Sequence, residues 1–281
     1  MNKTFHIELQ VNCVCSNNEF IDGIKLYYLP IEDQNQSIQQ ANLITSIPGE
    51  ITNSCDEQDN PVMFFKPSVR ANILHIKFCC QVNIKHKKRL LSAQSDLIDS
   101  KLFDFMPWQR VCLFEYTQPA ELPEHIVYKL HRYAMFQADQ SHFDPIKTIR
   151  KLNKIAYQQP AKLLDFLKGT KVLSDNRNQQ ELILFVLLCR VLSIPTRYVR
   201  GYTKQFSFVG QYQFKIHLWA EVYIPYIGWI GFDPKCYRLV DHNYIRCAVF
   251  ASVYQDVNQC QSSNKYENKS NSKLVEFSWS G

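Results

Sequence analysis

Residues 217–223, HLWAEVY, and residues 228–234, GWIGFDP, form the stretch of sequence that decides the fold. A third block, RVLSIPTRYVRGY, precedes them at residues 190–202. β-Branched and aromatic residues are frequent in the blocks, and Asp-Pro at their end is a common way to stop a strand. The pattern predicts consecutive strands at 197–202, 212–224 and 229–233.

His217 and Asp233 stand 16 positions apart on two of these predicted strands. If the strands are adjacent and antiparallel, that separation can bring the carboxylate beside the imidazole. Either residue alone is more often structural, because strand histidines commonly hydrogen-bond within a core. Acyl transfer by a thiol requires this arrangement, in which an imidazole holds the proton of the nucleophile and an acceptor orients the imidazole.

The three blocks together resemble the core of the transglutaminase-like superfamily, most strongly from Phe143 to Val257. The resemblance implies an α+β fold with a papain-like core of helices packed on an antiparallel sheet or barrel. It also implies a Cys-His-Asp triad, in which His217 and Asp233 are two members, and it places Trp219 and Trp229 at the substrate. Residues 29–30 and 59–62 resemble the small antiparallel β domain that precedes this core in bacterial relatives.

The resemblance places the nucleophile 17 positions before Pro195, and the residue at that position is Asn178. An asparagine amide is not a nucleophile, and near the head of a helix it is ordinarily an N-cap. Cys189 lies 11 positions further along the predicted helix, about 16 Å away, so it cannot substitute. Ser174 is best interpreted as a loop serine. Cys236 could project near the pocket mouth, although an ordinary loop cysteine is the simpler interpretation.

Changes in periodicity divide the chain into an amino-terminal β domain at 1–90, a connector at 91–122 and the transglutaminase-like core at 123–281. The β domain is predicted to contain strands at 4–15, 23–30, 62–65 and 73–85, with a polar stretch at 32–60. The core is predicted to contain helices at 123–138, from Pro145, at 160–168 and at 181–193, the last apolar on all sides. Further strands are expected at 244–253 and 274–278, with a mobile polar loop at 258–272.

Composition excludes several functional classes. The 281 residues are 46% hydrophobic, with a net charge of +6 spread along the chain except for the run Lys85-His86-Lys87-Lys88-Arg89. A solvated loop explains that run better than a nucleic-acid site does. No apolar stretch is long enough to cross a membrane and no secretory signal is visible, so a cytoplasmic location is expected. The ten cysteines are predicted to be reduced and mostly structural, and no metal or cofactor is implied.

Three functions are compatible with these observations. The first is a catalytically inactive transglutaminase-like protein that binds a peptide or protein amide in a degenerate cleft formed by Asn178, His217 and Asp233. The second is an active thiol-dependent amidase, peptidase or acyltransferase that uses a displaced nucleophile such as Cys236. The third is a scaffold for another subunit, in which the cleft has no role.

Overall fold

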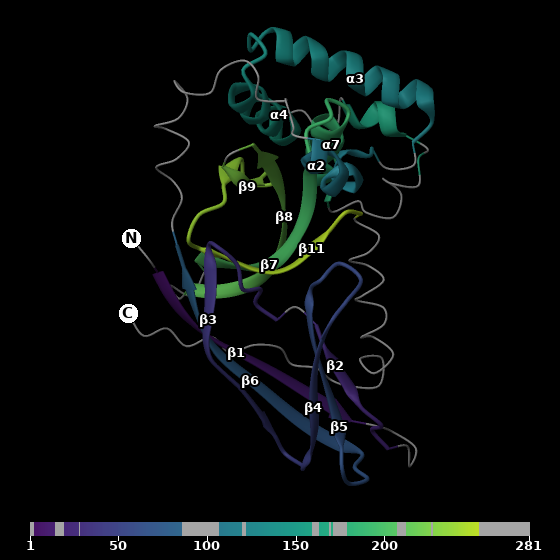
Figure 1. Ribbon diagram of the computed structural model, residues 1–281. Helices are drawn as coiled ribbons and strands as arrows, with labels where there is room; N and C mark the ends of the chain where they lie inside the picture. Colours follow the sequence, from purple (N-terminus) through teal and green to yellow (C-terminus); the bar gives the residue numbers. More distant parts are fainter. Residues whose placement is uncertain are drawn as a thin grey trace.

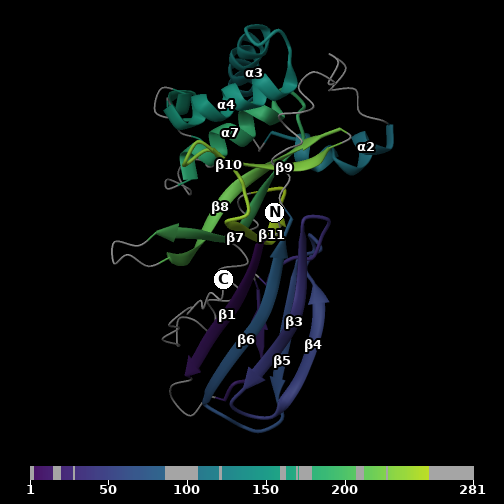
Figure 2. The same ribbon diagram turned by 90° about the vertical axis from the view of Figure 1, so that its left-hand side faces the viewer.

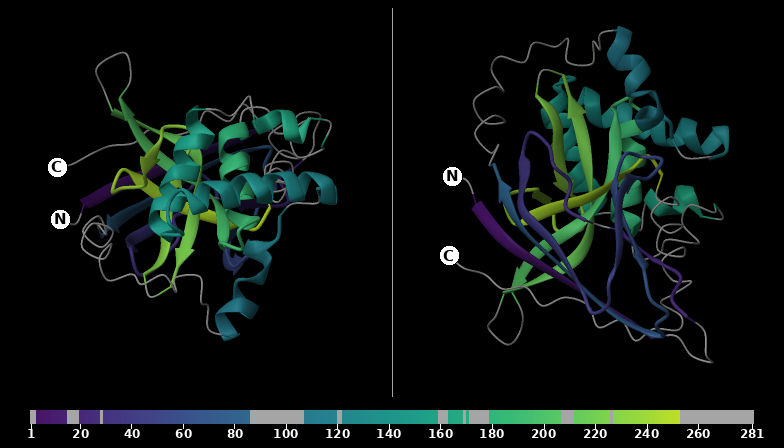
Figure 3. Two further views of the ribbon diagram at one scale, coloured as in Figure 1. Left: turned by 90° about the horizontal axis from the view of Figure 1, so that it is seen from above. Right: turned by 60° about the horizontal axis from the view of Figure 1, so that its bottom comes forward.

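Helices α3, α4 and α7 lie at one end of the computed structural model, strands β1 to β6 lie at the other, and strands β7 to β11 lie between them (Figures 1 and 2). Seen from above, the helices overlie the strands (Figure 3). The molecule therefore has the predicted α+β class. The structure describes residues 3–14, 20–27, 29–85, 107–119, 122–158, 163–168, 170, 179–206, 212–225 and 227–252.

The predicted strands at the two ends of the amino-terminal region pair with each other. Strands β1 (Lys3–Val14) and β6 (Ile73–Ile84) are antiparallel over their whole length. Their apolar residues, such as Phe5 and Val82, are buried, as alternation predicted. Strands β2 (Ile24–Leu26) and β5 (Pro61–Pro67) correspond to the two shorter predicted strands.

The polar stretch at 32–60 is not a simple connection. It contains strand β3 (Gln36–Thr45), which pairs with β6, and strand β4 (Gly49–Cys55), which pairs with β5. Both are edge strands, and every residue of β4 is exposed. A strand with two wet faces carries no alternation of apolar and polar residues, so hydrophobic patterning could not detect it.

Two predicted helices, at 123–138 and from Pro145, form with nearly the expected bounds, whereas of the one expected at 160–168 only residues 163–168 are described. Helix α4 (Pro145–Gln158) begins where expected, with the Asp144 carboxylate accepting a hydrogen bond from the Lys147 amide. Helix α3 spans Glu124–Asp139 and the short 3-10 helix η2 spans Asp165–Leu167. The expected connector also forms helix α2 (Pro107–Cys112) and the 3-10 helix η1 (Phe114–Thr117), because a proline is compatible with the first helical turn. None of the helices among the described residues is long and apolar enough to cross a membrane.

Helix α7 (Gln180–Arg190) is the centre of the core, and its residues from Leu182 onward are all buried. It packs on one face of a five-stranded antiparallel sheet. The helix ends before the predicted boundary at 193, because Ser193 adopts a left-handed conformation with φ of 58° that turns the chain into β7. The sheet order is β10 (Arg238–Leu239), β9 (Gly228–Asp233), β8 (Tyr212–Ile224), β7 (Thr196–Phe206), β11 (Tyr244–Phe250).

The opposite face of this sheet meets the amino-terminal strands. Tyr202, Ile245 and Cys247 share a buried cluster with residues of β1 and β6. Two side-chain amides complete the junction by pairing with the backbone of β11, an edge strand. The Gln36 amide donates to the carbonyl of Arg246 at 2.9 Å and accepts from its N–H at 3.0 Å.

Asn60 forms the same pair of hydrogen bonds with the backbone further along β11. Its amide donates to the Val249 carbonyl at 3.0 Å and accepts from the Val249 N–H at 2.7 Å. Gln36 and Asn60 are both buried. The two side chains therefore satisfy backbone groups that would otherwise make β11 an open edge.

Candidate functional site

The candidate site begins with the alternation of side chains along β8. Leu218, Ala220 and Val222 pack toward α7, so His217, Trp219 and Glu221 project from the opposite face. Gly201, the partner of His217 on β7, allows close approach there, since a side-chain carbon at this position would lie 1.9 Å from the Ile245 carbonyl oxygen.

The structure brings His217 and Asp233 together. Nε2 of His217 lies 2.7 Å from Oδ2 of Asp233, whose side chain is fully buried. Burial alone would raise the pKa of this carboxyl, but its hydrogen bonds and charge interaction with His217, and its hydrogen bond from Tyr244, outweigh burial and hold the pKa below its usual value. An ionised carboxylate can only accept, so Nε2 of His217 donates this hydrogen bond and Nδ1 is the ring nitrogen directed away from Asp233.

Tyr244 is a third member of this cluster that the sequence did not reveal. Its hydroxyl donates to Oδ2 of Asp233 at 2.8 Å, and its ring packs edge-on against Trp219 with 5.4 Å between ring centroids. Trp219 is 1% exposed and stacks on His217 at 6.5 Å, so it buttresses the imidazole. Tyr244 reaches the site from β11, two strands away from β8, and no local pattern signals such a contact.

The described thiols do not adopt a nucleophilic arrangement. Cys236 donates a hydrogen bond to Asp233, and burial together with this carboxylate raises the pKa of its thiol. Cys189 lies inside α7, where burial raises its pKa to about 12. Both effects oppose formation of a thiolate at neutral pH. Asn178 and Ser174 lie outside the described residues. Cys13, Cys80 and Cys189 are buried, as predicted.

A second polar cluster lies four residues along β8 from the imidazole. Oε2 of Glu221 accepts from Nη2 of Arg197 at 2.7 Å and from Nη1 of Arg246 at 3.2 Å. Arg246 also pairs closely with Asp33 on the loop before β3. Alternation along β8 predicts that Glu221 shares a face with His217, a signal available in the sequence. Arg246 and Asp33 come from distant segments and carried no such signal.

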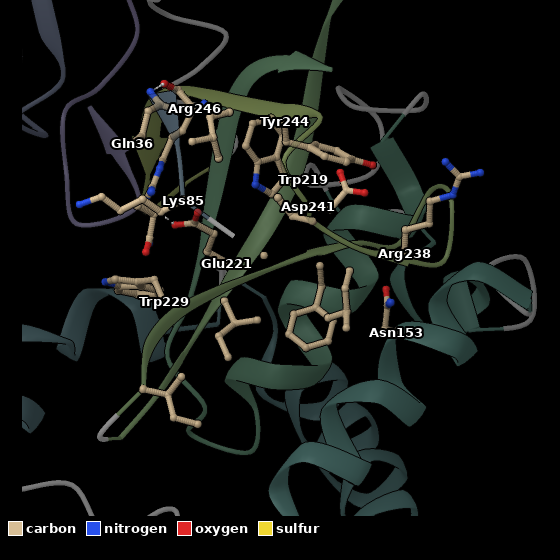
Figure 4. A pocket seen from close by; sticks show the side chains of 18 of the residues that line it. Gln36, Lys85, Asn153, Trp219, Glu221, Trp229, Arg238, Asp241, Tyr244 and Arg246 are labelled. Carbon is tan, nitrogen blue, oxygen red and sulfur yellow. Dashed lines mark hydrogen bonds and ion pairs between the residues drawn. The ribbon is translucent and has the colours of Figure 1, made fainter. Parts of the chain in front are cut away.

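A pocket of about 610 Å³ opens beside the two clusters (Figure 4). Trp219 and Trp229, the residues expected at the substrate, both line it. Trp229 is fixed by the Arg197 guanidinium, which stacks 4.0 Å from the centroid of its ring. His217 and Asp233 lie next to this pocket rather than in its wall, and Trp219 and Tyr244 connect the two.

Residues 126–234 match the model of a protein family described as the transglutaminase-like superfamily. The chain contains a transglutaminase-like domain. Its helix α7, its strands β7 to β9 and the His217–Asp233 pair all fall within the matched residues.

A solved structure has the same overall fold. The "Putative Cysteine Protease from Cytophaga hutchinsonii" aligns over 99% of this chain and 90% of its own, with a TM-score of 0.56 and 14% sequence identity. The likeness covers the amino-terminal strands as well as the transglutaminase-like domain, so the combination of the two recurs. No curated protein sequence is similar enough to this chain to count as a match. No group of three or more potential metal-binding side chains occurs among the described residues.

Proposed function

We propose that this transglutaminase-like protein binds a peptide or protein amide without cleaving it. The observation that carries the proposal is the contrast at Asp233. Its partner His217 is held as a triad imidazole would be, whereas the thiol that contacts the carboxylate, Cys236, has a raised pKa. A thiol activated for acyl transfer requires the opposite shift.

The sequence supports the same conclusion at the expected nucleophile. Asn178 stands two residues before α7, whose Phe185 ring packs 5.7 Å from the ring of Phe232, the neighbour of Asp233. An amide at this point can donate and accept hydrogen bonds, as the amide of a bound peptide does. Asn178, His217 and Asp233 are thus proposed to form a binding site in place of a catalytic one.

The test is turnover by the purified chain. Wild-type protein is incubated with fluorogenic peptide amides, and with a dansylated amine and casein to detect transamidation; no turnover is expected. Turnover that is abolished by His217→Ala would overturn the proposal. Loss of that activity in Cys236→Ser as well would establish the alternative, an enzyme with a displaced thiol.

A second test places a cysteine at position 178, where the nucleophile of the triad is expected. In Asn178→Cys the introduced thiol is expected to titrate with a pKa of about 4–7, as thiols paired with histidine do. Alkylation by iodoacetamide followed against pH measures this value, with the exposed Cys55 as an internal reference. Combining the variant with His217→Ala should return the pKa of the introduced thiol to about 8.5.

A further inference from the structure

The pocket beside the His217–Asp233 pair is assembled from both halves of the chain. Lys85 at the end of β6 and Gln36 at the start of β3 face residues of β8 to β11 and of α4 across it. Figure 4 shows Lys85 and Gln36 on one side of the pocket and Arg238 and Asn153 on the other. Its volume of about 610 Å³ suits a ligand larger than a single ion.

Part of the pocket wall is apolar and aromatic. Trp229, Ile230, Phe232 and Leu239 contribute to it. The indole N–H of Trp219 is also in this wall, is buried, and has no acceptor within the described residues. A ligand with an apolar body and hydrogen-bond acceptors matches these surfaces.

Positive charge is in excess around the pocket. Lys85, Arg150 and Arg238 line it, are exposed, and form no ion pair with any described residue. The carboxylate of Glu221 is already engaged by two guanidinium groups. Asp241, the other acidic side chain in the lining, forms no ion pair within the described part of the chain and accepts hydrogen bonds from Asn243.

We propose that this pocket selects carboxylate-bearing peptides and that Lys85, Arg150 and Arg238 determine this specificity. The inference rests on the proposed function, since it names the class of peptide that the site binds. The carboxylate meets the rim cations while the neighbouring part of the peptide lies against Trp229 and the indole N–H of Trp219. Lys85 was expected to belong to a solvated basic loop, and the structure instead places it at the pocket; the rest of that run, residues 86–89, lies outside the described residues.

The experiment uses the purified full-length protein and arrays of hexapeptides. Three sets differ only at two central positions, which are Glu, Gln or Lys, and each set is made with capped and with free carboxyl ends. Isothermal titration then measures Kd for the best binder of each set. Capped Glu peptides should bind about four- to twenty-five-fold more tightly than their Gln counterparts, because two carboxylates can each gain the two- to fivefold typical of exposed ion pairs. A preference for free ends without a preference for Glu would assign the carboxylate to a chain terminus.

Variants identify the cations responsible. Lys85→Gln and Arg238→Gln should each weaken binding of the best Glu peptide about two- to fivefold, with little change for its Gln counterpart. Lys129→Gln, which removes an exposed lysine on α3 outside the pocket, is the matched control. Added salt should reduce the Glu preference.

Equal binding of the three sets with no preference for free carboxyl ends, tighter binding of Lys peptides, or no binding of any peptide would overturn the inference. Turnover of the bound peptides is measured in parallel. Peptides that bind with the acidic preference and are cleaved would refute the non-catalytic function while retaining the specificity. Peptides that bind without charge preference and are not cleaved would refute the specificity while retaining the non-catalytic function.

Discussion

The two faces of the five-stranded sheet are built from different chemistry. Toward α7 the sheet presents a cluster of buried apolar side chains from β8, β9 and β11, such as Val222, Phe232 and Phe250. On the other face, ionisable side chains meet in pairs, including His217 with Asp233. Packing against α7 is independent of these ionisable groups, so the polar face can change its chemistry while the fold persists.

The apolar face should give the largest loss of stability. Phe185→Ala removes a fully buried ring that packs against Phe232 and is expected to lower the free energy of unfolding by about 3–5 kcal/mol. Urea unfolding followed by circular dichroism measures it. Phe136→Ala, at an exposed position of α3, should change stability by less than about 0.5 kcal/mol. An equal loss in both variants would show that α7 does not carry the fold.

The second-largest loss of stability is expected where Glu221 pairs with the guanidinium groups of Arg197 and Arg246. Glu221→Gln leaves the buried Arg246 and the half-buried Arg197 without their shared anion, and a loss of about 2–3 kcal/mol in the free energy of unfolding is expected because the amide oxygen still accepts one hydrogen bond. Asp241→Asn serves as the control, since the Asp241 carboxylate accepts hydrogen bonds from its neighbour Asn243 and forms no ion pair with a described residue. A loss in Glu221→Gln no greater than in this control would mean that the cluster does not fasten the strands.

Substitution of Asp233 should give a smaller loss of stability, and this loss should depend on pH. Its pKa in the folded protein lies below the value of about 3.9 in an unfolded chain, so its ionised form contributes stability above about pH 4 that is lost as the pH falls through the folded pKa. Asp233→Asn should therefore be less stable than wild type by about 1–2 kcal/mol at pH 7, and the difference should shrink below pH 4. Urea titrations from pH 3 to pH 7 test this, and a difference that does not vary with pH would contradict it.

The smallest effect is expected at Tyr244. Tyr244→Phe deletes one hydrogen bond to Asp233 while keeping the ring against Trp219, so stability should fall by about 1 kcal/mol. The pKa of Asp233 should rise, since a donor to the carboxylate has been removed. Carboxyl carbon chemical shifts followed against pH report this pKa, and an unchanged value would exclude Tyr244 from the cluster.

The sequence predicted what local periodicity encodes. Strand β8 has the bounds expected for residues 212–224, and helix α4 begins at the predicted proline. The contact between His217 and Asp233 was also foreseeable, because one turn joins their strands. Strand β4 was missed because it is exposed on both faces, and strand β3 because a register shift between Gln39 and Asn42 interrupts the alternation that would relate Ile38 to Leu43.

Contacts between distant segments could not be predicted. The partners of Tyr244, Arg246 and Gln36 come within reach only after the sheets have assembled, and no spacing along the chain predicts these contacts. Whether Lys85 and Arg238 form ion pairs with other described residues also depends on the three-dimensional arrangement, so their availability at the pocket could not be predicted from the sequence. The pair of His217 and Asp233 could therefore be predicted from the sequence, and the pocket beside it could not.

Gln36 and Arg246, which join β3 to β11, stand 210 positions apart. Closing so long a loop has a large entropic cost, so this junction is expected to form late in folding. During synthesis, the first strands leave the ribosome long before their docking surface exists. Until β11 has emerged, a nascent chain has no pocket in which to hold a ligand.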